Sequence, residues 1–220
     1  MQLNKIYTYP GMILFYLFLV TGAFILFLTE KGTWVIWLNE NGSYFFDVLF
    51  RYWTWFGDGL IFLAPILMFL FRSYIFLFIT LLASIIQTIF VQGLKRYVFP
   101  DLVRPRMFFE DFGSFRQIED VEFYSNNAFP SGHTATAFTI ALILSIFLKD
   151  KRWSIVLILM AIGVGISRIY LMQHFFVDVY FGAIFGVISA LLSAYIIGKN
   201  KYLRERFGNR SLGHGRMPAP

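Results

Sequence analysis

Three short motifs contain the side chains with the clearest chemical potential. In chain order they are Lys95 with Arg104-Pro105, then Pro130-Ser131-Gly132-His133, and then Ser167-Arg168 with His174 and Asp178. They combine three cationic side chains, two imidazoles and one carboxylate, a set that could bind and cleave a phosphate ester. The chain has three histidines, and two of them lie in these motifs while His214 lies in a polar tail. Chance is a poor explanation of this placement.

A phosphate monoester carries about −1.5 to −2 charge near neutral pH, so a site for it needs concentrated positive charge. Arg104 and Arg168 can each donate two parallel hydrogen bonds to phosphate oxygens, and Lys95 adds a point charge. Ser131 precedes an apolar run and is a candidate N-cap, so the amides that follow it would face an anion. Gly132 would let the backbone approach the phosphate closely.

His174 and Asp178 are four residues apart, which puts them on one face of a helix. A carboxylate that accepts a hydrogen bond from one ring nitrogen leaves the other nitrogen free to attack phosphorus, so we expect His174 to be the nucleophile. We expect His133 to protonate the departing alkoxide and then to activate the water that releases phosphate. Any one of these residues could equally fill a structural role in a helix bundle. Three ordered motifs at the ends of apolar runs favour a functional site.

The composition is that of a polytopic membrane protein. Hydrophobic residues make up 58% of the 220 residues and charged residues 15%, against roughly 25% charged in soluble domains. The length of the apolar runs predicts an all-α fold with six transmembrane helices, the first of them retained. The predicted spans are Met12–Leu28, Trp55–Phe71, Tyr74–Gln92, Gly132–Leu148, Trp153–Tyr170 and Phe175–Ile197. The second is the weakest, because it contains Asp58 and Pro65.

Basic residues predict the orientation of the chain. The segment after the last predicted span holds Lys199, Lys201, Arg204, Arg206, Arg210 and Arg216. Loops rich in Lys and Arg face the cytoplasm, and an even number of spans puts both termini on the same side. We therefore expect cytoplasmic termini and a site at the outer face. The expected partners of the basic tail are membrane lipid headgroups rather than nucleic acid.

No repeat or flexible linker divides the chain, so residues 1–220 are expected to form one domain with a basic tail at about 199–220. The stretch at about 95–129 is too polar for the bilayer core and too long for a simple turn. We expect it to fold as an extracytoplasmic cap over the site. Gly182 and Gly186 form a small-xxx-small pair that permits close packing, either inside the bundle or at a dimer seam.

The motifs resemble those of the type-2 phosphatidic acid phosphatase superfamily of integral membrane lipid phosphatases. The pattern of that family reads Lys-x6-Arg-Pro, Pro-Ser-Gly-His and Ser-Arg-x5-His-x3-Asp, and the second and third parts match completely. In the first part, eight residues separate Lys95 from Arg104, so Lys95 or Arg96 could fill the first cationic position. Six spans also match the bacterial members, which implies a location in the bacterial inner membrane with the site on the periplasmic face.

The resemblance also implies the roles of the motif residues. The catalytic residues would be His133, His174 and Asp178, and the phosphate-binding residues would be Lys95, Arg104, Ser131, Gly132 and Arg168. It implies no metal and no cofactor. The residues agree, because metal-dependent phosphatases need clustered carboxylates and Asp178 is the only acid in the motifs.

We therefore expect a membrane hydrolase that removes phosphate from a lipid phosphate or diphosphate through a phosphohistidine intermediate. The candidate substrates within the family are phosphatidic acid, phosphatidylglycerol phosphate and undecaprenyl diphosphate, with a lipid A 1-phosphatase as an alternative. A lipid phosphotransferase would use the same site but pass the phosphoryl group to a lipid hydroxyl. A non-catalytic phospholipid-binding or transport protein is the alternative from another class. The sequence does not choose the oligomeric state.

Overall fold

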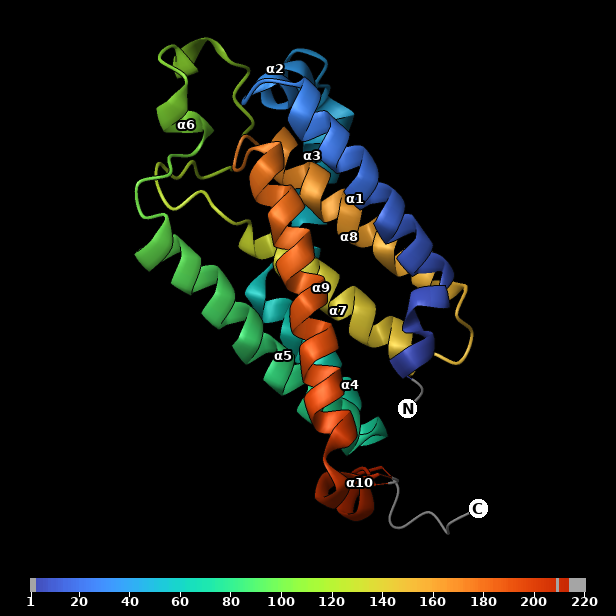
Figure 1. Cartoon of the computed structure of the whole chain (residues 1–220). Helices are drawn as coiled ribbons and strands as arrows, with labels where there is room; N and C mark the ends of the chain where they lie inside the picture. The colour runs from blue at the N-terminus through green and yellow to red at the C-terminus, as the bar shows by residue number, and fades with distance from the viewer. Residues whose placement is uncertain (1–2, 209, 214–220) are drawn as a thin grey trace.

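The computed structural model describes residues 3–208 and 210–213, which form helices joined by turns and loops, with no β-strand among them (Figure 1). The predicted all-helical class is confirmed. Part of the predicted basic tail, namely residue 209 and residues 214–220, lies outside the described residues.

In the part of the chain that the structure describes, four helices are long and apolar enough to cross a membrane. They are α1 (Pro10–Leu28), α5 (Tyr74–Gly93, continued by further helical turns to Val98), α8 (Trp153–Tyr170) and α9 (Phe176–Lys199). Their bounds agree with four of the predicted spans to within two residues, because long apolar runs fix a membrane helix more strongly than any other sequence signal. The chain is therefore a multi-pass membrane protein.

The second predicted span, Trp55–Phe71, is not a straight α-helix. From α3 (Tyr44–Trp53) the chain passes through the 3-10 turns η2 (Thr54–Gly57) and η3 (Gly59–Phe62) into α4 (Leu63–Arg72). The two halves, Tyr44–Gly57 and Gly59–Arg72, meet at an angle of 53°, and they make a fifth span if they are counted as one. We call residues 54–62 the bend.

Two residues explain why the chain bends here. Asp58 has an extended backbone, and its side chain accepts a hydrogen bond of 2.8 Å from the N–H of Leu60, so it ends one helical segment and caps the next. A Cβ atom on Gly57 would lie 2.5 Å from Val164 and 2.6 Å from the carbonyl oxygen of His133. Glycine therefore lets the bend lie directly against α7 and α8.

Helix α7 (Gly132–Phe147) lies at the centre of the bundle, packed against α5, α8 and α9 (Figure 1). As predicted, Ser131 is its N-cap, and the Ser131 Oγ atom accepts hydrogen bonds from the Thr134 amide and hydroxyl groups. The helix has 16 residues, which span about 24 Å and fall short of the ~30 Å hydrocarbon core. A Cβ atom on Gly182 would lie 2.6 Å from the Ser131 carbonyl oxygen. The small-xxx-small pair therefore serves packing inside the bundle.

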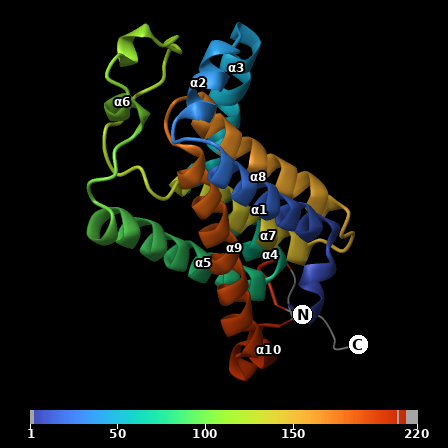
Figure 2. The same ribbon diagram turned by 45° about the horizontal axis from the view of Figure 1, so that its top comes forward.

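The two ends of the bundle carry different parts of the chain (Figures 1 and 2). At one end lie η1 (Leu3–Thr8), the α7–α8 turn and α10 (Lys201–Phe207), and the Lys151 ammonium lies 4.6 Å from the centre of the Tyr9 ring. At the other end lie α2 (Thr33–Glu40), α3 and residues 99–131, which we call the α5–α7 link. The link contains α6 (Pro105–Phe108) and η5 (Phe112–Ser114), and it is tied to α2 by a pair of hydrogen bonds between Asn39 and Arg116.

Candidate functional site

A cavity of about 310 Å³ lies beside the α5–α7 link, and residues of all three motifs line it. Its walls come from α5, the bend, the link, α7, α8 and the loop before α9. The motif residues on the wall are Lys95, Arg104, Gly132, His133, Arg168 and His174. Both imidazoles that the sequence analysis singled out therefore face one cavity, which we call the motif cavity.

Lys95 reaches the motif cavity from a π-helical turn, Leu94–Val98, that continues α5. The turn closes with a hydrogen bond of 2.8 Å from the Phe99 N–H to the Leu94 carbonyl, an i→i+5 bond that holds more residues per turn than an α-helix. Lys95 is buried, whereas Arg96 is exposed away from the cavity. Of the two candidates for the first cationic position, the structure brings Lys95 to the cavity.

Arg104 and Arg168 are held in place by neutral groups. The Nε atom of Arg104 donates a hydrogen bond of 2.9 Å to the Asn126 carbonyl, and Nη1 donates to the Gln173 carbonyl at 3.3 Å. Arg168 donates from Nη1 to the Thr54 hydroxyl at 2.9 Å, and its buried Nε has no partner among the described residues. Burial lowers the pKa of the Arg104 guanidinium, yet such a group stays charged near neutral pH.

The three cations share one property: none of them forms an ion pair with a carboxylate of the described residues. A buried charge without a partner costs several kcal/mol, so a ligand with the opposite charge is needed to compensate it. In the described part of the chain, no three His, Asp or Glu side chains gather in a way that could hold a metal ion. The cavity is therefore suited to an anion.

His174 is fixed by a tight turn at the end of α8. Its backbone N–H donates to the Arg168 carbonyl at 3.1 Å, and the turn contains Met172 in the left-handed region with φ 54°. A bulky residue in this region costs of order 1–3 kcal/mol and persists only where the surroundings enforce it. The turn thus links the position of His174 directly to that of Arg168.

Asp178 lies behind His174 rather than on the cavity wall. The Nδ1 atom of His174 lies 3.3 Å from Asp178 Oδ2, which also accepts a hydrogen bond of 2.9 Å from the Phe175 N–H. Burial, and then the charges of Arg104, Lys95 and Arg168, hold the pKa of the His174 imidazole well below 6.5. A neutral ring that donates from Nδ1 to the carboxylate has a free lone pair on Nε2.

His133 lies in the first turn of α7, and its Nε2 atom is 3.9 Å from Asp58 Oδ2 in the bend. In the sequence, Asp58 stands out only as a charged residue that weakens a predicted span. The signal was nevertheless there, because an acidic residue inside an apolar run is a functional candidate by default. Thr54, the partner of Arg168, was also missed, since nothing in the sequence pairs the two residues.

Ser131 and Gly132 have different positions. Gly132 lines the motif cavity, and a Cβ atom there would meet only Val91, at 3.6 Å. Ser131 is fully buried and does not line the cavity, and its hydroxyl oxygen faces Thr134. Direct contact of the Ser131 side chain with phosphate therefore stays a prediction, while its position as the cap of α7 is observed.

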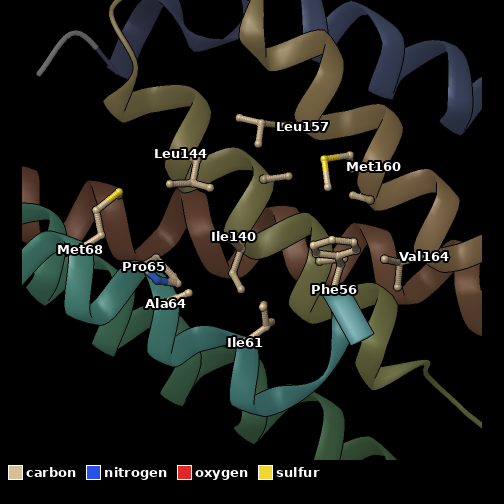
Figure 3. Close-up of a pocket in the computed structure, with 13 residues that line it drawn as sticks. Phe56, Ile61, Ala64, Pro65, Met68, Ile140, Leu144, Leu157, Met160 and Val164 are labelled. Carbon is tan, nitrogen blue, oxygen red and sulfur yellow. The ribbon is translucent and has the colours of Figure 1, made fainter. Parts of the chain in front are cut away.

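A second cavity, apolar and also about 310 Å³, lies between the bend, α4, α7 and α8 (Figure 3). Aliphatic, aromatic and thioether side chains line it, among them Phe56, Ile61, Ile140, Leu144, Leu157 and Met160. Some wall residues of the two cavities are neighbours in sequence: Phe56 precedes Gly57, and Ala137 follows Thr136, with Gly57 and Thr136 on the wall of the motif cavity.

Comparison with known proteins finds one family model and several relatives. The model described as the PAP2 superfamily matches residues 72–202. The crystal structure of LpxE from Aquifex aeolicus is 31% identical, with a TM-score of 0.63 over 73% of this chain and 92% of that chain. The crystal structure of a transmembrane PAP2 type phosphatidylglycerolphosphate phosphatase from Bacillus subtilis is 24% identical, with a TM-score of 0.60 over 89% of this chain and all of that chain. At that identity, the second likeness shows the fold alone.

One curated relative is similar over a shorter stretch. The bacitracin transport permease protein BcrC of Bacillus licheniformis is 35% identical over 85 residues, which are 39% of this chain. The match spans about two fifths of the length of that relative, 41%.

Proposed function

Because the chain belongs to the PAP2 superfamily, we propose that it is an integral membrane phosphatase that hydrolyses a lipid phosphate or diphosphate through a phosphohistidine intermediate. The observation that carries the proposal is the motif cavity, in which three cations without carboxylate partners surround two imidazoles. The candidate substrates are phosphatidic acid, phosphatidylglycerol phosphate and undecaprenyl diphosphate. Lipid A 1-phosphate is the alternative within the same chemistry.

In the first step, Lys95, Arg104 and Arg168 bind the phosphate oxygens, and the free amides at the start of α7 add hydrogen bonds. The Nε2 lone pair of His174 attacks phosphorus while the bond from phosphorus to the ester oxygen breaks. Protonated His133 gives its proton to the departing oxygen. The cations stabilise the charge on the transferring phosphoryl group, which is the main contribution that a protein makes to this reaction.

In the second step, neutral His133 takes a proton from water as the water oxygen attacks the phosphohistidine. The bond from phosphorus to Nε2 breaks, inorganic phosphate leaves, and both imidazoles return to their starting forms. Asp178 acts through His174, because its carboxylate accepts the Nδ1 hydrogen bond and stabilises the positive charge that the ring gains when it is phosphorylated.

Two features support a lipid as the substrate. The bend and α7 contribute wall residues to both the motif cavity and the apolar cavity of Figure 3, and the apolar cavity offers space for hydrocarbon. If the last turn of α7 lies at one membrane boundary, its 16 residues place the first turn, with His133, within about 6 Å of the other boundary, near the level of lipid phosphates.

The proposal includes six spans: the four long helices, the bent pair and α7. Both termini would then be cytoplasmic, and the site would face the periplasmic side of the bacterial inner membrane, with the α5–α7 link as an extracytoplasmic cap. The basic segments at Lys149–Arg152 and in α10 lie at the opposite end of the bundle from the link, which supports this orientation.

The test is phosphate release from a panel of purified lipid phosphates in detergent, with a chelator present. The variants His174→Ala, His133→Ala and Arg168→Ala are compared with the wild type. Loss of the nucleophile should lower the turnover number on the order of 10³-fold or more. The control is Thr80→Val, which removes a buried hydroxyl of α5 that is bonded to its own helix, at the Phe76 carbonyl.

Two alternatives predict different results. A phosphotransferase would release less than one inorganic phosphate per lipid consumed, because the phosphoryl group passes to a lipid hydroxyl. A transport or lipid-binding function is favoured only by the name of the Bacillus licheniformis relative. Full turnover by His174→Ala on every lipid phosphate of the panel would contradict the phosphohistidine mechanism and favour binding without chemistry.

A further inference from the structure

The motif cavity has a wall that the proposed chemistry does not use. Gln87 of α5 and Thr136 of α7 both line the cavity, and they are 6% and 3% exposed. Neither side chain forms a hydrogen bond with any residue that the structure describes, although a glutamine amide has two donor hydrogens and an acceptor oxygen. Each residue as a whole is buried, but its polar atoms are accessible from the cavity, since Arg168 Nε is the one fully buried side-chain N or O atom without a partner in the described residues.

Other hydroxyl groups in the same two helices behave differently. Thr80 donates to the Phe76 carbonyl, Thr139 to the Ala135 carbonyl and Ser145 to the Ala141 carbonyl, each one helical turn back. Thr136 is an exception among these threonines. Buried polar groups are normally hydrogen-bonded. A polar side chain inside a membrane helix that has no hydrogen-bond partner and faces a cavity is therefore a candidate for contact with a ligand.

Gln87 lies deeper in the bundle than Lys95, and Thr136 lies deeper than His133. Gln87 precedes Lys95 by eight residues, which corresponds to about 12 Å along the helix, and Thr136 follows His133 by three, about 4.5 Å. Both positions lie toward the end of the bundle that carries α10, away from the link. When a phosphate is held by the cations, Gln87 and Thr136 face the part of the substrate that follows it.

The chemistry of these side chains selects among substrates. An amide and a hydroxyl are neutral, so they do not supply the charge that a second phosphate needs. A neutral amide N–H and a hydroxyl suit the carbonyl oxygen of an ester or amide. A prenyl phosphate offers no such group, because its hydrocarbon begins directly after the phosphate.

We propose that Gln87 and Thr136 form a subsite that hydrogen-bonds the acyl carbonyl groups of the substrate, and that the chain therefore acts on an acylated phospholipid rather than on a prenyl phosphate or diphosphate. The inference rests on the proposed function, because it takes the cations to hold the phosphate. It adds a substrate class, a lipid phosphate monoester with acyl groups close to the phosphate.

The test compares three probes in detergent micelles: a diacyl phosphatidic acid, its dialkyl ether analogue, which lacks the carbonyl oxygens, and farnesyl monophosphate. We expect the wild type to prefer the ester over the ether by about 10- to 100-fold in kcat/KM, since the ether leaves the buried amide and hydroxyl unpaired. In Gln87→Leu with Thr136→Val, this preference should fall to less than about threefold. Activity on farnesyl monophosphate should stay within about threefold of the wild-type value.

The ratio of ester to ether is measured within each variant, so a partly unfolded preparation does not change it. Thr80→Val is the matched control, because it removes a hydroxyl of α5 outside the cavity, and it should keep the wild-type ratio. Equal wild-type activity on ester and ether, or an unchanged ratio in the double variant, would overturn the subsite. Failure of the proposed function looks different, since then the wild type would release phosphate from none of the probes or His174→Ala would retain full turnover.

Discussion

At the scale of single residues, the imidazole of His174 is buried and lies close to three positively charged side chains. The side chain is almost fully buried, and burial together with Arg104, Lys95 and Arg168 holds its pKa well below 6.5. Protonation would add a fourth positive charge to the cavity wall. The structure therefore favours the neutral ring, which is the form that can attack phosphorus.

This lowered pKa predicts how stability depends on pH. The unfolded chain binds a proton at this histidine below about pH 6.5, whereas the folded chain does not, so the contribution of His174 to stability is present above pH 6.5 and is lost as the pH falls. The loss can reach about 1.4 kcal/mol per pH unit. Unfolding of the wild type and of His174→Asn in detergent, measured between pH 7.5 and pH 5, should show a shallower loss in the variant. Parallel curves would contradict a neutral His174.

Asp58 offers a second prediction at this scale. Its carboxylate lies 3.9 Å from His133 Nε2 and can stabilise the protonated form that the proposed first step requires. Both side chains are partly exposed, so solvent weakens the pair below the ~4 kcal/mol expected at this distance at an effective dielectric constant of 20. Asp58→Asn should lower the turnover number roughly tenfold, which corresponds to about 1.4 kcal/mol. The asparagine oxygen can still cap Leu60.

The pH profile separates this role from a structural one. In the complex with a phosphate, whose negative charge offsets the three cations, the loss in Asp58→Asn should be greatest at alkaline pH, where protons that charge His133 are scarce, and smaller near pH 6. KM should change less than about twofold, because Asp58 does not line the motif cavity. A uniform loss at every pH, or a loss that appears only in KM, would contradict the assignment.

The sequence predicted the motif residues because their types and spacing carry chemistry, and six of the eight line one cavity. It left Lys95 and Arg96 undecided, since the choice depends on a π turn, which has no reliable local signal. It predicted two roles for Ser131, phosphate binding and the N-cap of α7, and the structure shows the hydroxyl in the N-cap role. Asp58 and Thr54 were missed because their partners are distant in the chain.

At the scale of helices, close packing of α7 against α9 determines where along the bundle the site lies. A Cβ atom on Gly186 would collide with the Ala135 carbonyl oxygen and lie 3.0 Å from the Cβ of Phe138. The Thr139 hydroxyl also donates a hydrogen bond of 3.0 Å to the Gly186 carbonyl. These contacts hold the first two turns of α7 against the middle of α9, and so fix the two helices that place His133 and His174 at the same cavity.

Gly186→Ala should therefore lower the free energy of unfolding by about 1–3 kcal/mol, the usual effect of an added methyl group in a well-packed core. The matched control is Gly93→Ala in α5, where a Cβ atom would have no neighbour within 4 Å. That substitution should be neutral or slightly stabilising, because alanine favours helix more than glycine does. Thermal unfolding in detergent measures both. A change in oligomeric state without a change in stability would instead indicate a dimer seam.

The long helices followed from the sequence because an unbroken apolar run has one physical solution in lipid. The bend did not, since the run Trp55–Phe71 is apolar enough to be a span. What breaks it is local: Asp58 caps η3, and Gly57 fits a contact with α7 and α8 that exists only in the folded chain.

At the scale of the whole molecule, a polar cluster fixes the link to the bundle. Arg116 of the link forms an ion pair with Asp47 of α3 and donates a hydrogen bond of 2.9 Å to the hydroxyl of Tyr170 at the end of α8. Tyr170 in turn donates to Asp47 at 2.6 Å. Because the link carries Arg104 and α8 carries Arg168, the cluster helps to fix the positions of these two arginines relative to each other. The sequence predicted a cap but could not predict these partners, because Asp47 is 69 residues from Arg116.

The proposed orientation gives the last prediction. The chain contains no cysteine, so a single introduced thiol can report the side of the membrane on which it lies. Ser114 in the link and Lys149 in the α7–α8 turn are both exposed and lie at opposite ends of the bundle. In intact spheroplasts, a membrane-impermeant maleimide should label Ser114→Cys and leave Lys149→Cys unlabelled until the membrane is permeabilised. The bias of Lys and Arg toward the end that carries α10 is the physical reason. The reverse labelling pattern would put the motif cavity on the cytoplasmic side, and the substrate would then have to be a lipid phosphate of the inner leaflet.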